Sequence, residues 1–81
     1  MKKVKEVKSY ILEIYGGMGK NPNELIDLIE EGWLYKVKRE DGAIAEIQRM
    51  DADDYIDSKR PVAKLNAKLN IEKALKQFKP Y

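Results

Sequence analysis

The stretch from Trp33 to Met50 constrains the fold most strongly, because it has the pattern of a β-hairpin. Its first strand alternates Trp33, Tyr35 and Val37, which are aromatic or β-branched, with Leu34, Lys36 and Lys38. Asp41-Gly42 follows, a pair typical of hairpin turns. Two strands alone are barely stable in water, so helices or a third strand must cover the apolar face. We expect the covered face to contain Trp33, Tyr35, Val37 and Ile47.

The length of the connecting loop decides which residues of the hairpin face each other. A two-residue turn would pair Val37 with Glu46 and so mix apolar and polar side chains on each face. A three-residue loop, residues 40–42, pairs Val37 with Ala45 and keeps the faces separate. It also pairs Tyr35 with Ile47. The sequence therefore predicts the three-residue loop, with its glycine in the left-handed conformation.

Two helices are predicted before the hairpin. In residues 4–15 apolar side chains recur every three or four positions, which favours a helix that ends at a left-handed Gly16. The β-favouring residue types in this segment leave a strand as the alternative. Asn21 then has the pattern of an N-cap followed by Pro22, and we expect a second helix that closes at Gly32. The apolar face of this second helix would contain Leu25, Ile26, Leu28 and Ile29.

The C-terminal segment, from about residue 58 to Pro80, has the composition of a helix, but its apolar residues lie in two groups. At about 100° per residue, the two groups lie nearly opposite each other. Either the helix breaks near Asn70, or one long helix has two apolar faces that one small core cannot bury together. The second alternative leaves one face as a contact surface. The first group is Val62, Leu65 and Leu69, and the second is Ala67, Ile71, Ala74, Leu75 and Phe78.

These elements predict an α+β fold within one small domain, residues 1–81. The expected order is α-α-β-β-α, with the β-hairpin at about 33–50 packed by helices. The alternative order, βαββα, takes residues 4–15 as a strand. The chain has no cysteine, so helix packing, the sheet or a partner chain must supply its stability.

The glycine-rich stretch from Gly16 to Lys20 precedes a predicted helix and so raises the question of a phosphate site. A Walker A loop needs glycine at position 14 and Ser or Thr after the lysine, and a dinucleotide fingerprint needs glycine at position 22. The sequence has Ile, Asn and Pro at those places. Lys20 beside a helix N-terminus would attract an anion only weakly. We interpret the stretch as a connector, with Met18 as a candidate contact for a partner protein.

The residue types give little support to catalysis or metal binding. The chain has no His, Cys or Thr and only two Ser, which excludes catalytic triads, thiol chemistry and imidazole bases. Residues 51–57 are rich in acids, but Tyr55 and Ile56 stand at the fifth and sixth positions, where an EF-hand loop requires an acid or Asn and then Gly. Acids are also common near helix N-termini, so this segment is a turn or the start of a helix. We predict no enzymatic activity, no catalytic residue, no cofactor and no metal site.

Charge is unevenly distributed along the chain. Residues 21–57 contain four bases and eleven acids, a net of −7, whereas residues 58–81 contain seven bases and one acid, a net of +6. Such segregation would place a basic surface beside an acidic one, and either would steer a partner. Around an ideal helix the basic side chains wrap much of the circumference. The candidate nucleic-acid contacts, which would bind phosphates, are Lys59, Arg60, Lys64, Lys68, Lys73 and Lys76.

The surplus apolar face is the stronger indication of function. It predicts a small non-enzymatic protein-binding module, a regulator or inhibitor of the kind that phages and mobile elements encode. The partner would be another protein or a second copy of the chain; nucleic-acid binding is the alternative function. No apolar run approaches the roughly 20 residues that span a bilayer, so we expect no membrane partner and a cytoplasmic location. The candidate protein contacts are Met18, Val62, Leu65 and Leu69.

Overall fold

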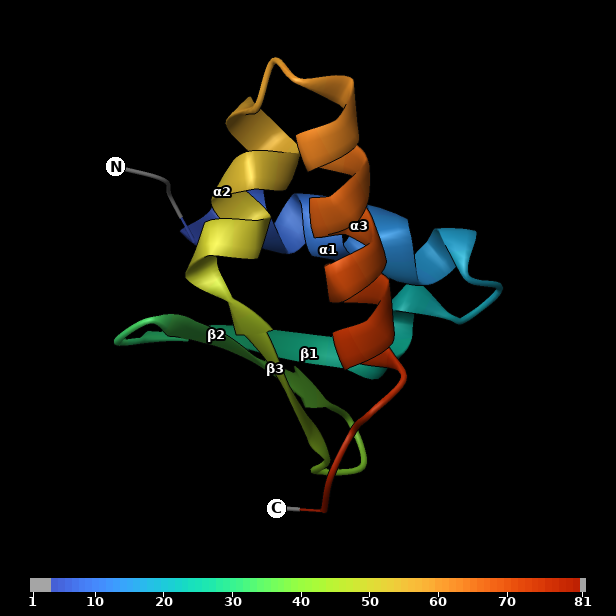
Figure 1. The fold of residues 1–81 in the computed structure, drawn as a ribbon. Helices are drawn as coiled ribbons and strands as arrows, with labels where there is room; N and C mark the ends of the chain where they lie inside the picture. Colours follow the sequence, from blue (N-terminus) through green and yellow to red (C-terminus); the bar gives the residue numbers. More distant parts are fainter. Residues whose placement is uncertain (1–3, 81) are drawn as a thin grey trace.

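A computed structural model describes residues 4–80, which form a small α+β domain with three helices and a three-stranded antiparallel sheet. The three helices lie on one side of the sheet (Figure 1). The order is α-β-β-β-α-α, and the strands lie side by side as β1-β2-β3. The elements are α1 (Val4–Gly17), a 3-10 turn η1 (Pro22–Glu24), β1 (Leu25–Glu31), β2 (Leu34–Arg39), β3 (Ile44–Gln48), α2 (Arg49–Asp57) and α3 (Pro61–Leu75).

The hairpin of β2 and β3 has the predicted register. Val37 pairs with Ala45 and Tyr35 pairs with Ile47, and all four side chains are buried under the helices. The Arg39 amide donates a hydrogen bond to the Ala43 carbonyl over 2.8 Å. The loop between these two residues therefore contains three residues. Gly42 in this loop has a φ of 90°, the left-handed conformation that glycine adopts without strain. The alternation of side chains therefore fixed the pairing correctly.

The prediction that Trp33 lies on the covered face is wrong. Gly32 and Trp33 form the two-residue turn between β1 and β2, with a φ of 59° at Gly32, and the Trp33 side chain is 84% exposed. A positive φ at the first turn residue is typical of tight hairpin turns, and it requires glycine there. Because the strand starts only at Leu34, Trp33 does not take part in the alternation that buries Tyr35.

The predicted second helix, residues 21–32, is also wrong for most of its length. Asn21 does accept a hydrogen bond from the Asn23 amide and Pro22 follows it, but the helical segment ends after one 3-10 turn. The chain then forms β1, which pairs antiparallel with β2 and gives the hairpin its third strand. A bulge near Ile26 shifts the register, so that Leu25 and Leu28 both face the core. Pairing with β2 outweighs the local helical signals.

The helix prediction for residues 4–15 is confirmed by α1, which buries Val7, Ile11 and Ile14. Its predicted end is wrong in detail. The helix continues to Gly17, and the left-handed residue is Gly19, with a φ of 79°. Gly16 instead allows close packing, because a Cβ at this position would lie 3.1 Å from the Pro22 side chain.

Helices α2 and α3 complete the layer above the sheet. The acidic segment 51–57 belongs to α2, and α3 runs through Asn70 without a break. The residues after α3 return to the sheet, where Ile44 and Lys79 exchange backbone hydrogen bonds of 2.9 and 3.0 Å along β3. Within residues 4–80 no helix has the length and apolarity needed to cross a membrane.

Candidate functional site

Helix α3 carries the exposed apolar face that the sequence indicated. Val62, Leu65 and Leu69 are 71%, 55% and 51% exposed. They lie at positions i, i+3 and i+7, so on a helix they form one stripe along its axis. We call these three residues the α3 outer face. Scattered single apolar residues are normal on a surface, whereas an aligned set of three is typical of a contact.

The opposite side of α3 explains why this stripe faces outward. Ala67, Ile71 and Leu75 are each at most 2% exposed and pack into the core. The helix is also tied to α2, because the Asn70 side chain donates a hydrogen bond to Asp51 over 3.2 Å. A rigid helix that is anchored on one side cannot turn its other side inward. The α3 outer face is therefore fixed in the solvent.

All six predicted nucleic-acid contacts are exposed, but they do not form one stripe. Lys59 and Arg60 precede the first turn of α3, and Lys64 lies 6.0 Å from the Tyr55 ring on the side of α2. By helical geometry, Lys68 and Lys73 lie on opposite flanks of the α3 outer face. Lys76 follows at the end of the helix. The basic charge surrounds the apolar stripe and does not define a groove of its own.

Met18 is less available than the other predicted protein contacts. It is half-buried and packs against the core. Its amide donates hydrogen bonds of 3.1 Å to the carbonyls of Ile14 and Tyr15, which closes the end of α1. Lys20 is exposed next to it, beside a 3-10 turn of only three residues. This stretch connects α1 to the sheet, and only part of the Met18 side chain is accessible to a partner.

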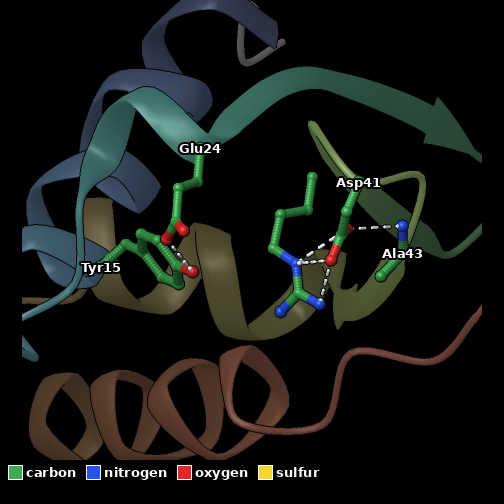
Figure 2. A network of polar contacts seen from close by, with 5 residues as sticks. Tyr15, Glu24, Asp41 and Ala43 are labelled. Carbon is green, nitrogen blue, oxygen red and sulfur yellow. Dashed lines mark hydrogen bonds and ion pairs between the residues drawn. The ribbon is translucent and has the colours of Figure 1, made fainter.

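A polar network around Arg39 holds the loop between β2 and β3 (Figure 2). The Arg39 side chain donates to the Asp41 carboxylate over 2.9, 3.0 and 2.6 Å, and the Ala43 amide donates to the same group over 3.0 Å. The guanidinium also lies 4.6 Å from the centre of the Phe78 ring. The Arg39 charge is thus already paired, so this network stabilises the loop and the C-terminal segment and offers no free charge to a ligand.

Figure 2 also shows the contact between the side chains of Tyr15 and Glu24. The Tyr15 hydroxyl donates to Glu24 over 3.1 Å and joins α1 to η1. Burial raises the pKa of Tyr15, and the neighbouring Glu24 carboxylate raises it further. The Tyr15 ring meets Phe78 edge to face at 6.2 Å. A tyrosine that keeps its proton and has a partner acts here as a structural link between elements.

The Asp41 network makes stability depend on pH. The Arg39 side chain, and then the Ala43 amide, lower the pKa of Asp41 from 3.8 to about 2. A carboxyl whose pKa is lower in the folded state stabilises that state above pH 3.8, and the contribution is lost as pH falls toward 2. We therefore expect the difference in unfolding midpoint between the natural protein and Asp41→Asn to shrink between pH 4 and 2, measured by urea denaturation.

The variant Arg39→Gln provides a check on that pH dependence, because it removes the largest cause of the shift. It should lose the same pH-dependent component as Asp41→Asn. A midpoint difference that stays constant from pH 5 to pH 2 would show that Asp41 is not held as a carboxylate by the loop. The quantity compared is the difference in midpoint between variants at each pH.

The acids of α2 do not converge on a common point. No group of three or more acidic side chains in residues 4–80 is close enough to hold a metal ion. Asp51 instead accepts the hydrogen bond from α3 described above. Asp53 and Asp54 lie further along α2 and line the same hollow as Trp33 of the β1–β2 turn. Their role is therefore better sought in the surface that surrounds them.

A second exposed cluster, which the sequence did not predict, lies where the β1–β2 turn meets α2. Trp33 and Met50 are 84% and 70% exposed. The Arg49 amide donates to the Trp33 carbonyl over 2.8 Å, and the Arg49 side chain donates to the Gly32 carbonyl over 2.9 Å. These bonds hold the turn against α2. Only the Gly32-Trp33 pair hinted at this cluster, since glycine permits a tight turn that exposes its neighbour.

The acids of α2 complete this second cluster. A shallow hollow is lined by Trp33, Arg49, Met50, Asp53 and Asp54, which we call the Trp33 surface. The Arg49 side chain donates its hydrogen bond to the Gly32 carbonyl and lies 3.7 Å from the Glu30 carboxylate. Burial raises the pKa of Tyr35, and the Glu30 carboxylate raises it further.

Comparisons of the chain with protein-family models, with curated proteins and with solved structures found no match, so the two exposed surfaces are interpreted from their own chemistry.

Proposed function

We propose that this protein is a small non-enzymatic binding module that docks a partner protein through the α3 outer face. The supporting observation is that Val62, Leu65 and Leu69 stay at least half exposed on a helix whose other side is fixed in the core. Fully burying one such side chain is worth about 1.5–3 kcal/mol. Because the three are only partly exposed, covering them would gain roughly 3–5 kcal/mol in total. That is a useful centre for an interface.

The shape of the surface supports a helical or flat partner. The apolar stripe is straight, about two turns long, and flanked by lysines on both sides. An apolar centre within a polar rim is the usual anatomy of a protein interface. The lysines would favour a partner whose own apolar patch is edged by acids. A regulator or inhibitor of this size would act by covering a surface on its target.

Nucleic-acid binding remains the alternative, since every predicted phosphate contact is exposed. The apolar stripe between the lysines favours a protein partner, because a phosphate backbone offers nothing to cover it. Phosphate contact would also weaken steeply with salt, whereas burial of aliphatic groups would not. The same experiment can therefore separate the two functions.

The test is affinity capture from the native host with the natural protein and with Leu65→Asp/Leu69→Asp as baits. We expect the charged variant to retain at least tenfold less of the captured partner, because two carboxylates cannot be buried in an apolar contact. Ser9→Asp, on the exposed side of α1, is the control for an added negative charge. Circular dichroism should show all three baits equally folded.

Two outcomes would count against the proposal. One is that the same proteins are captured in equal amounts by the natural bait and by Leu65→Asp/Leu69→Asp. The other is that capture disappears when the lysate is treated with nuclease at unchanged salt, which would favour the nucleic-acid alternative. A partner that resists nuclease and is lost only with the α3 variant supports the docking function.

A further inference from the structure

The Trp33 surface has an apolar centre and unpaired negative charge. Within residues 4–80 the carboxylates of Asp53 and Asp54 make no hydrogen bond or ion pair, whereas the Arg49 side chain beside them is already engaged. The Trp33 ring is exposed almost completely, and the face of an indole attracts cations. This surface is therefore suited to an apolar segment that carries lysine or arginine.

The α3 outer face has the complementary chemistry on the same chain. Its stripe of aliphatic side chains is flanked by Lys68 and Lys73 and followed by Lys76. Within residues 4–80 none of these three lysines forms an ion pair. Each surface thus offers an apolar patch with uncompensated charge, and the two charges are opposite in sign.

A symmetric contact between two α3 outer faces is less favourable. It would bring the lysines of one copy against those of the other, and like charges across an interface oppose association. A symmetric contact between two Trp33 surfaces would oppose Asp53 and Asp54 in the same way. The pairing that satisfies both surfaces joins the Trp33 surface of one copy to the α3 outer face of another.

We propose that the occupant of the Trp33 surface is the α3 outer face of a second copy of this chain. The indole and Met50 would cover the aliphatic stripe, and Asp53 and Asp54 would face its lysines. This inference rests on the proposed docking role of α3 and names its partner. The contact is heterologous, so each added copy leaves one surface of each kind free, and assembly continues until a ring closes.

The tryptophan itself provides the measurement, because Trp33 is the only one in the chain. We expect its emission to shift to shorter wavelength as protein concentration rises, since docking removes the indole from water. Sedimentation velocity should show the average mass rising over the same range. Both changes should shift to higher protein concentration as salt is raised, because the flanking ion pairs are screened while the apolar contact remains.

Charge reversal identifies the two surfaces. Asp53→Lys/Asp54→Lys and Lys68→Glu/Lys73→Glu should each weaken self-association at least tenfold, because each places like charges across the contact. Mixing the two variants should restore association, since each retains the natural form of the surface that the other lacks. The control for total charge is Glu6→Lys/Glu40→Lys, which changes exposed sites on α1 and on the β2–β3 loop.

Two results would overturn this inference. The first is a constant mass and constant Trp33 emission at all concentrations. The second is self-association that Asp53→Lys/Asp54→Lys leaves unchanged, which would indicate contact through α3 alone. Neither result affects the capture experiment above: a nuclease-resistant partner lost with Leu65→Asp/Leu69→Asp would uphold the docking function even if self-association fails.

Discussion

Replacing Ile71 by Ala is expected to destabilise the domain by about 2–5 kcal/mol, while replacing Leu69 by Ala changes its stability by about 0.5 kcal/mol or less. The two residues lie two positions apart on α3, but Ile71 is 1% exposed and Leu69 is 51% exposed. Truncation of a packed side chain leaves a cavity, whereas truncation of an exposed one leaves only water. Urea denaturation followed by circular dichroism measures both.

A small domain has little stability to lose, so Ile71→Ala is paired with the milder Ile71→Val, for which about 0.5–1.5 kcal/mol is expected. The deciding quantity is the loss of stability at Ile71 relative to the loss at Leu69. Equal losses for Leu69→Ala and Ile71→Ala would mean that α3 is buried on both sides, and the α3 outer face would no longer be available to any partner.

The two apolar faces of α3 were visible in the sequence, but its continuity was not. Spacing alone placed Val62, Leu65 and Leu69 opposite Ile71, because an α-helix has a fixed angle per residue. Asn70, however, is equally suited to cap a new helix and to sit inside one. The structure resolves this through a contact from α2, where Asp51 accepts its side-chain hydrogen bond. Such a contact between distant residues has no local pattern.

The hairpin shows the same division between local and non-local information. The alternation of side chains was enough to predict the pairing of Tyr35 with Ile47 and of Val37 with Ala45. The position of Trp33 depended on the element before it. Because residues 25–31 form a strand, Gly32 and Trp33 become a hairpin turn, and the tryptophan leaves the covered face. The wrong prediction for residues 25–31 therefore also placed Trp33 on the wrong face.

The candidate surfaces divide in the same way. The α3 outer face follows from the periodicity of a single helix, so it could be predicted before the fold was known. The Trp33 surface combines a turn with the first turns of α2, and it exists only because Arg49 holds the two together. No spacing rule brings Trp33 next to Asp53 and Asp54. Surfaces built from several elements require the fold.

The strand β1 leads to the second large expected effect. Replacing Leu28 by Ala should cost about 2–4 kcal/mol, whereas replacing Ile29 by Ala should cost less than about 1 kcal/mol. Leu28 is 6% exposed and pairs with Val37 over the core, while Ile29 is 43% exposed and pairs with Lys36 on the open face of the sheet. Neighbouring residues of a strand point to opposite faces, so their costs must differ.

The contrast between Leu28 and Ile29 distinguishes the strand from the helix that the local sequence favours. On a helix, Leu25, Leu28 and Ile29 would share one apolar face, and each truncation would cost a similar amount. On β1, the bulge near Ile26 brings Leu25 to the core face with Leu28 and leaves Ile29 outside. Urea midpoints for Leu25→Ala, Leu28→Ala and Ile29→Ala decide between them. Three similar losses would favour the helix, because no strand register buries both Leu28 and Ile29 against one layer of helices.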